Sequence, residues 1–244
     1  MLEQNNTTLK NSDLRLCDET RSESLALIII PTFNEAENIA RLLNKLSELY
    51  QSSVDILVID DNSPDGTIDI VHSMQQRIRG LQVIKREKKL GLGTAYITGF
   101  HYALDQGYRY VIEMDADYSH DPAEVSSFFD AIKEADLVIG SRYMNNTVNV
   151  VNWPLGRLIL SKLASIYTQF ITGMPVDDPT SGFKCFNAEV LRVLEYIVVH
   201  ELVHLLERNH TDRFTALMDG FLPSWRVCRE TLNSGLLAHE VWQY

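Results

Sequence analysis

The sequence predicts an α/β protein with a mostly parallel sheet and helices on both faces, followed by an all-α C-terminal segment. Two observations predict this class. Short apolar runs alternate five times with segments whose apolar residues recur at helical spacing. The connections between these segments are short, which favours a three-layer arrangement.

Each strand is expected where a short apolar run occurs. The first run, LALIII at 25–30, stops at Pro31 and is typical of a strand buried on both faces. Further strands are expected at 54–59, 81–84, 110–114 and 137–139. Apolar spacing predicts helices at 35–49, after Gly66, and from Gly91 to Leu104. Another helix is expected to begin at Pro122, with Asp121 near its N-cap.

Composition sets the broad class. The chain has 244 residues, of which 45% are hydrophobic and 23% charged, so one large or two small soluble domains are expected. A net charge of −11 argues against nucleic acid as a partner, although residues 85–89 form a local basic patch. Three widely spaced cysteines predict neither a disulfide framework nor a cysteine zinc site, which favours a reducing compartment.

The N-terminal 24 residues are polar and mixed in charge, so a disordered arm is expected over 1–24. They contain no apolar stretch typical of a signal peptide. No run of 18 apolar residues occurs, so no membrane span is expected. We therefore expect a cytoplasmic location, at most peripheral to a membrane face.

Acidic and amide side chains follow three of the predicted strands directly, at 34–35, 60–61 and 115–117. Ligands of such sheets sit outside the carboxyl ends of the strands, so these groups are expected on one rim. Crowded carboxylates stay ionised together only with a compensating cation or donor. Asp115 and Asp117 point the same way in an extended segment, and Mg²⁺ or Mn²⁺ would suit them. Capping and turn formation stay open as the alternative, above all for Asp65 in SPDGT.

Six motifs then carry a family resemblance: PTFNEAEN at 31–38, DDNSPDGT at 60–67, REKKLGLGTAY at 86–96, MDADYSHDP at 114–122, GSRY at 140–143 and DPTSGF at 178–183. In this order they resemble the family-two inverting glycosyltransferases, and within them the dolichol- or polyprenol-phosphate mannose synthases. The resemblance covers about residues 25–190. It implies a GT-A fold, a GDP-mannose donor and a polyprenyl or dolichyl phosphate acceptor in a membrane.

The resemblance also implies roles for individual residues. Asp115 and Asp117 match the metal and diphosphate motif, and Asp117 and Arg142 are the implied catalytic residues. Arg157 and Ser161 match positions that bind the lipid phosphate, although a solvated helix face explains Arg157 equally well. The implied nucleotide-sugar ligands are Pro31, Phe33, Glu35, Ile59, Asp61, Asp115, Ala116, Asp117 and Arg142. The family usually has tyrosine at the position of Phe33. The implied reaction is attack of a phosphate oxygen on the anomeric carbon, which displaces GDP.

After about Glu189 the chain departs from that pattern, and its strand-rich continuation is not visible. The chain instead contains His200, Glu201 and His204 as H-E-x-x-H. On a helix the two histidines lie on one face and can chelate Zn²⁺, with Glu201 as candidate general base. His210 is the candidate third ligand if the helix ends near Asn209. An amphipathic helix with incidental histidines is the alternative.

This segment resembles the YgjP-like (DUF45, WSS1-like) zinc metallopeptidases over about residues 190–234. The resemblance rests on the histidine spacing, Phe214 and Pro223-Ser224-Trp225. That family has a β-rich region before its helix, which nothing here supplies. The expected organisation is therefore an arm at 1–24, a GT-A domain at 25–190 and a helical segment at 191–244, with the join near 189–196.

Three functions follow from these patterns. The first is a metal-dependent glycosyltransferase that moves a mannosyl or other hexosyl group to a polyprenyl phosphate. The second is a zinc metallopeptidase that uses the C-terminal histidines. The third is a module that binds nucleotide-sugar or zinc without turnover.

Overall fold

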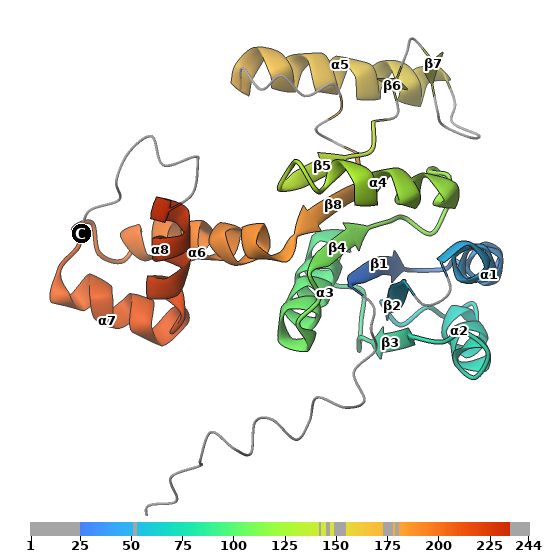
Figure 1. The fold of residues 1–244 in the computed structure, drawn as a ribbon, viewed down its shortest axis with the longest axis horizontal. Helices are drawn as coiled ribbons and strands as arrows, with labels where there is room; N and C mark the ends of the chain where they lie inside the picture. Colours follow the sequence, from blue (N-terminus) through green and yellow to red (C-terminus); the bar gives the residue numbers. More distant parts are fainter. Residues whose placement is uncertain are drawn as a thin grey trace, which may run out of the picture.

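The structure, a computed structural model, describes residues 25–50, 53–141, 143–144, 147–148, 155–172, 178 and 181–234. Its main element is a six-stranded sheet in the order β3-β2-β1-β4-β8-β5 (Figure 1). These strands are β1 (Ala26–Thr32), β2 (Val54–Asp60), β3 (Leu81–Lys85), β4 (Tyr110–Glu113), β5 (Leu137–Ile139) and β8 (Lys184–Asn187). A separate two-stranded pair consists of β6 (Tyr143–Met144) and β7 (Thr147–Val148). The arm expected at 1–24 lies outside the described residues.

The helices follow the expected alternation. They are α1 (Ile39–Tyr50), α2 (Thr67–Gln75), α3 (Leu92–Gln106), the 3₁₀ turn η2 (Pro122–Glu124), α4 (Val125–Ala131), α5 (Leu155–Thr172), α6 (Ala188–His204), α7 (Asp212–Phe221) and α8 (Trp225–Ser234). The Asp121 side chain accepts a hydrogen bond from the Ala123 amide, which confirms the expected cap before Pro122.

The sheet is mostly parallel, as the alternation predicted. β3, β2, β1 and β4 run parallel, whereas β8 runs antiparallel to both β4 and β5. The strand β8 was not expected, because its four residues KCFN form no continuous apolar run.

One expected strand end was wrong, because β1 continues through Pro31 to Thr32. The β1–β4 ladder ends at Ile29, whose carbonyl accepts from Met114, whereas the Thr32 carbonyl accepts from Asp61 on the β2 side. Pro31 therefore turns its missing donor toward the side where the ladder has already ended. A proline is tolerated in a strand at such a position.

Period-two alternation divides the apolar side chains of the sheet between two core layers. On β1, Ile28 and Ile30 belong to one layer, and Leu27 and Ile29 belong to the other. The first layer packs against α1, α2 and α4, and the second against α3 and the start of α6. Helices thus cover both faces of the sheet, as expected.

The helices after β8 form a third core around Tyr196, Phe214, Met218 and Trp225. α6 runs from the sheet to the other two C-terminal helices (Figure 1). Its Leu191 packs in the core beside α3, whereas its Tyr196 packs in the third core with α7 and α8. The all-α C-terminal segment is therefore confirmed. The domain boundary at 190/191 stays a prediction, and one continuous helix crosses it.

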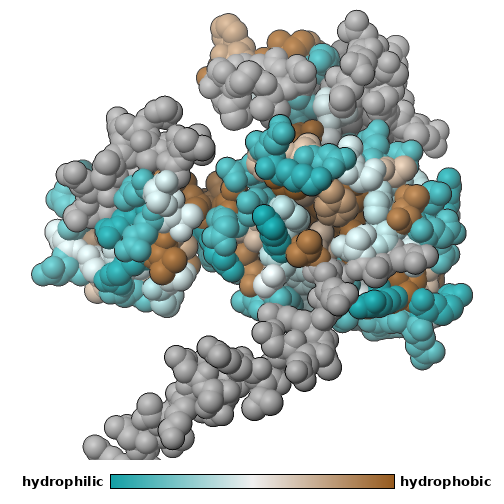
Figure 2. All heavy atoms as spheres, viewed as in Figure 1, coloured by the Kyte–Doolittle hydropathy of each residue, from teal (hydrophilic) through white to brown (hydrophobic). Residues whose placement is uncertain are grey.

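α5 carries an exposed apolar stripe. Its spacing of three and four residues places Leu163, Ile166, Tyr167, Phe170 and Ile171 on one face, and all five are more than half exposed. Figure 2 shows hydrophobic atoms at the surface in this upper part of the molecule. Among the described residues, no helix combines the length and the apolarity that crossing a bilayer requires.

Candidate active site and candidate metal centre

A pocket of ≈ 230 Å³ opens at the carboxyl ends of β1, β2 and β4. It brings together most of the residues that the sequence placed on one rim. Its walls are Pro31, Thr32, Phe33, Glu35, Asp61, Lys89, Gly91, Leu92, Ala95, Asp115, Ala116 and Asp117. Ile59 does not line it, because its side chain is fully buried in the core beside α3.

Asp61 occupies the β2 side of this pocket and is held from several directions. Its Oδ1 accepts from the Arg86 guanidinium, and both side chains are 8% exposed. Its Oδ2 faces the amides of Leu90 and Gly91 at 3.1 and 3.3 Å. Asp61 therefore fixes the segment that leads into α3, and its charge is compensated within the protein.

Asp115 lies deeper, between α3 and the segment before β8. The Tyr96 hydroxyl donates to Asp115 Oδ1 over 3.3 Å. Burial, then the carboxylates of Asp115 and Glu113, raise the pKa of the Tyr96 phenol above its usual range, so it stays a donor at neutral pH. On the other side, a Cβ at Gly182 would lie 2.6 Å from Asp115 Oδ2.

Glu113, two residues earlier, is buried at the end of β4. Burial raises the pKa of this carboxyl, and the Lys184 ammonium, 3.4 Å away, opposes the shift. Because Lys184 belongs to β8, this ion pair joins β8 to β4, the strand that Asp115 and Asp117 follow.

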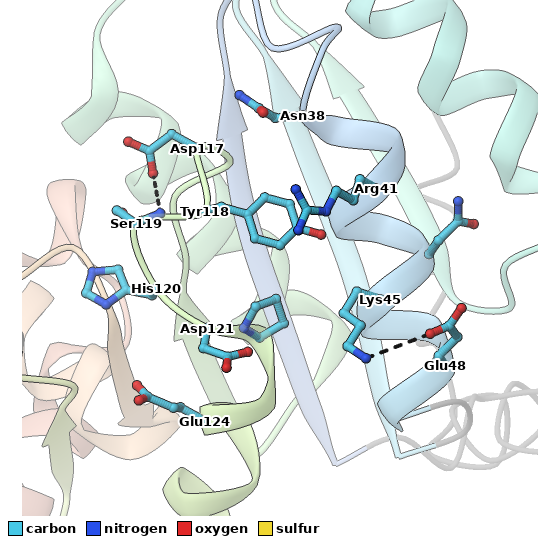
Figure 3. A pocket seen from close by; sticks show the side chains of 12 residues that line it. Asn38, Arg41, Lys45, Glu48, Asp117, Tyr118, Ser119, His120, Asp121 and Glu124 are labelled. Atoms are coloured by element: carbon cyan, nitrogen blue, oxygen red, sulfur yellow. Dashed lines mark hydrogen bonds and ion pairs between the residues drawn. The ribbon is translucent and has the colours of Figure 1, made fainter. Parts of the chain in front are cut away.

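Asp117 is exposed at the mouth of the pocket. Its Oδ1 accepts from the Ser119 amide at 2.9 Å, and the intervening Tyr118 has φ 59°, a left-handed conformation that costs free energy in a tyrosine. Arg41 lies over the Tyr118 ring, 4.5 Å from its centroid, as Figure 3 shows. Asp117 also borders a wider groove of ≈ 1050 Å³ between α1 and residues 117–124 (Figure 3).

The loops after β1 and β2 hold each other in place. Asp65 Oδ2 accepts from the Ala36 amide, and its Oδ1 accepts from the Thr67 amide and hydroxyl. The Thr67 hydrogen bond lowers the pKa of the Asp65 carboxyl. These contacts agree with the alternative in which Asp65 forms a turn and does not bind a ligand.

Arg86, Lys89 and Tyr96 were not among the site residues predicted from the sequence, although all three belong to the motif at 86–96. Lys89 lies over the Phe33 ring, with its Nζ 3.9 Å from the centroid, and lines the pocket. Lys89 belongs to the basic patch at 85–89, so its charge was visible in the sequence. That Lys89 lies over Phe33, just after the end of β1, was not visible.

The side chains of three predicted site residues lie outside the described part of the structure. Arg142 lies outside the described residues, and Arg157 and Ser161 belong to α5 but their side chains are not described. Their roles stay predictions.

The pocket fits a hard divalent cation by the chemistry of its donors. Asp115 and Asp117 offer carboxylate oxygens to the same space, which is the ligand type that Mg²⁺ and Mn²⁺ prefer. One or two protein carboxylates plus phosphate oxygens are a usual ligand set for Mg²⁺.

A second cluster lies at the end of α6. The Nε2 atom of His200 is 3.1 Å from that of His204 and 3.3 Å from that of His210. Two nitrogens at about 2.0–2.1 Å from a tetrahedral zinc would lie about 3.3 Å apart. The three imidazoles therefore fit one zinc ion.

The histidine cluster lies against the third core, since the His200 ring is next to the rings of Tyr196 and Phe214. His210 lies in the connection after α6, which ends at His204, so the three imidazoles come from one helix and the turn that follows it. Burial, then the neighbouring histidines, lower the pKa of His200 to about 4, which keeps its imidazole neutral as a metal ligand must be. Glu201 is exposed beside the cluster.

Comparison with known proteins decides the family. The family described as Glycosyl transferase family 2 matches residues 27–194, more than half of the chain. The chain belongs to glycosyltransferase family 2. A second family, described as YgjP-like, metallopeptidase domain, matches residues 189–235, so the helical segment of this glycosyltransferase is similar to part of a metallopeptidase.

Two curated relatives of this family-2 chain are named for mannosyl transfer to polyprenyl phosphates. The undecaprenyl-phosphate mannosyltransferase of Micrococcus luteus is 40% identical over 169 residues, which cover 69% of each chain. The polyprenol monophosphomannose synthase of Mycolicibacterium smegmatis is 39% identical over 203 residues, 82% of this chain and 75% of the relative.

Solved structures confirm the fold of the family-2 domain. Glucosyl-3-phosphoglycerate synthase from Mycobacterium tuberculosis, in complex with Mn²⁺ and UDP, superposes with a TM-score of 0.53 at 19% identity, over 76% of this chain and 66% of that one. Mannosyl-3-phosphoglycerate synthase from Rubrobacter xylanophilus superposes with a TM-score of 0.52 at 17% identity, over 70% of this chain and 56% of that one. At these identities the likeness shows the fold alone.

Proposed function

We propose that this chain transfers a mannosyl group from GDP-mannose to a polyprenyl or dolichyl phosphate. The observation that carries the proposal is the convergence of Asp61, Asp115 and Asp117 with Phe33 and Lys89 around one pocket. The names of the two curated relatives supply the sugar and the acceptor class.

The transfer requires one bond to form as another breaks. A phosphate oxygen of the acceptor bonds to the anomeric carbon of the sugar, while the bond from that carbon to the diphosphate oxygen breaks and GDP leaves. The acceptor oxygen is already anionic, so no strong general base is needed. Positioning and charge neutralisation are then the main contributions of the protein.

Each group in the pocket has a proposed role in that step. Asp115 and Asp117 would hold Mg²⁺ or Mn²⁺, and the ion would supply positive charge to neutralise the diphosphate. Lys89 brings a further positive charge to the same space. The remaining proposed nucleotide ligands are Pro31, Phe33, Glu35, Asp61, Ala116 and Arg142. Ile59 is not among them, because its side chain is buried in the core beside α3.

The acceptor is a lipid, so the proposal includes contact with a membrane face. α5 has no acidic residue and two basic ones, Arg157 and Lys162, although the whole chain carries a charge of −11. Its exposed apolar stripe would face the lipid, and its basic residues suit anionic headgroups. Arg157 and Ser161 are the proposed contacts to the acceptor phosphate.

A transfer assay tests the proposal directly. The purified chain is incubated with GDP-[¹⁴C]mannose, polyprenyl phosphate in detergent and Mn²⁺, and the organic phase is counted. We expect lipid-linked label that is lost with EDTA and with Asp115→Asn. Asp130→Asn, a change at an exposed surface carboxylate, is the matched control and should retain activity. Absence of label in the organic phase for the unaltered chain would contradict the proposed transfer.

We further propose that His200, His204 and His210 bind one zinc ion, because their Nε2 atoms converge at the spacing of zinc ligands. A peptidase activity with Glu201 as general base is the second candidate function. Zinc content by elemental mass spectrometry and cleavage of a fluorescent casein separate binding from hydrolysis. Glu201→Gln should retain zinc and abolish any cleavage. Binding of zinc and GDP without mannosyl transfer or cleavage would favour the non-catalytic module.

A further inference from the structure

We propose that Tyr96 is a positioning residue, whose hydroxyl holds the Asp115 carboxylate in the orientation that receives the donor's metal and diphosphate. The inference rests on the proposed function. Tyr96 acts through Asp115 and does not itself line the pocket.

The contact is made by a well-fixed side chain. Tyr96 is 7% exposed and donates to Asp115 Oδ1 over 3.3 Å. Its ring stacks on Phe100 at 6.3 Å between centroids, and Phe100 in turn packs edge-on against Phe186 at 5.5 Å. The hydroxyl therefore reaches Asp115 from a ring that the core holds in one place.

The opposite side of Asp115 is closed by backbone. A Cβ at Gly182 would lie 2.6 Å from Oδ2, closer than real side chains approach. The Asp115 carboxylate is thus confined between a phenol on α3 and a glycine before β8. A donor on one oxygen and a wall at the other define the direction of the carboxylate.

Tyr96 also links the carboxylate to the other side of the pocket. α3 begins at Leu92, and Gly91, Leu92 and Ala95 from its first turns line the pocket. The same hydrogen bond therefore sets the distance between the start of α3 and the acidic motif. Partners of this kind behind a metal ligand change metal affinity by about 10–100-fold when removed.

The test is Tyr96→Phe, which removes only the hydroxyl. Tyr108→Phe is the matched control. The Tyr108 hydroxyl also donates to a carboxylate, that of Asp55, over 2.8 Å. The Tyr108 side chain packs beside the same core layer as Tyr96, and it does not line the pocket. Mn²⁺ affinity in the presence of saturating GDP is measured by electron paramagnetic resonance, and the melting temperature is measured alongside. We expect Tyr96→Phe to weaken Mn²⁺ binding on the order of 10-fold, with Tyr108→Phe within about twofold of the unaltered chain.

The outcomes are distinguishable. Equal Mn²⁺ affinity in Tyr96→Phe and the unaltered chain would overturn the positioning role while leaving the proposed function standing. Equal weakening in both variants would show a general effect of losing a buried hydrogen bond and would also overturn it. Failure of the unaltered chain to bind Mn²⁺ with GDP would overturn the proposed function, and the inference with it.

Discussion

Asp61 and Arg86 form a buried ion pair on one side of the pocket, and the same carboxylate faces the amides of Leu90 and Gly91. The guanidinium extends this contact to Thr94 on α3 through a 2.7 Å hydrogen bond. The Asp61–Arg86 ion pair thus joins the end of β2, the Leu90–Gly91 segment and the first turn of α3. The shape of the pocket depends on it.

Arg86→Gln should destabilise the fold, because it leaves the Asp61 charge buried without its partner. We expect the free energy of unfolding in urea to fall by about 3 kcal/mol, with weaker GDP binding. Lys133→Gln breaks an exposed pair with Asp130 and is the control, with no measurable loss expected. An Arg86→Gln chain as stable as the Lys133→Gln chain would contradict the structural role of the pair.

Gly182→Ala should displace Asp115, since the added methyl group would collide with Oδ2. The expected results are weaker Mn²⁺ binding and a stability loss of about 1–3 kcal/mol from overpacking. Gly220→Ala is the control, because a Cβ there meets nothing within 4 Å among the described residues and α7 should tolerate it. Titration with Mn²⁺ and urea unfolding check both variants, and unchanged Mn²⁺ affinity in Gly182→Ala would argue against the confinement of Asp115.

Zinc should stabilise the helical segment by joining α6 to the turn that carries His210. At a free zinc concentration a thousand times the Kd, binding adds about 4 kcal/mol. We expect zinc to raise the melting temperature of the unaltered chain, but not that of His210→Ala. His72→Ala, at an exposed histidine on α2, should respond like the unaltered chain. Equal responses in all three chains would place the zinc elsewhere.

Cys185 and Cys228 should resist alkylation in the native protein. Burial raises the pKa of Cys185 to about 12 and also raises the pKa of Cys228, so less of each thiol is present as the reactive thiolate at a given pH. Iodoacetamide at pH 8, read out by peptide mass spectrometry, should modify neither residue until urea is added. Raising the pH to 9 should not change this result for Cys185, whose pKa lies well above that pH. Rapid labelling of either thiol in buffer would show that the core around it is open.

The sheet was predictable because its strands carry continuous apolar runs, such as LALIII at 25–30. β8 was missed because its residues Lys184–Asn187 form a short mixed run whose pairing with β4 is set by contacts distant in sequence. The passage of β1 through Pro31 likewise depends on where its neighbour β4 ends, which local pattern does not encode.

The site was partly predictable for a similar reason. Asp115 and Asp117 follow a strand directly, so their place on the rim follows from the sheet alone. The contacts of Arg86, Lys89 and Tyr96 depend on the path of the chain between β3 and α3. The charge and the spacing of these residues do not predict that path. The convergence of His200 and His204 follows from helical spacing, whereas His210 reaches them through the turn after α6, whose path that spacing does not predict.

The central claim is that the carboxylates at the strand ends share a divalent cation with the donor's diphosphate. Calorimetric titration of GDP into the chain, with and without Mn²⁺, tests it most directly in comparison with Asp117→Ala. We expect Mn²⁺ to tighten GDP binding in the unaltered chain. Asp117→Ala should lose that gain while still folding, because the exposed Asp117 side chain gives up only its hydrogen bond from the Ser119 amide. GDP affinity that does not depend on Mn²⁺, or that is the same in Asp117→Ala, would contradict the claim.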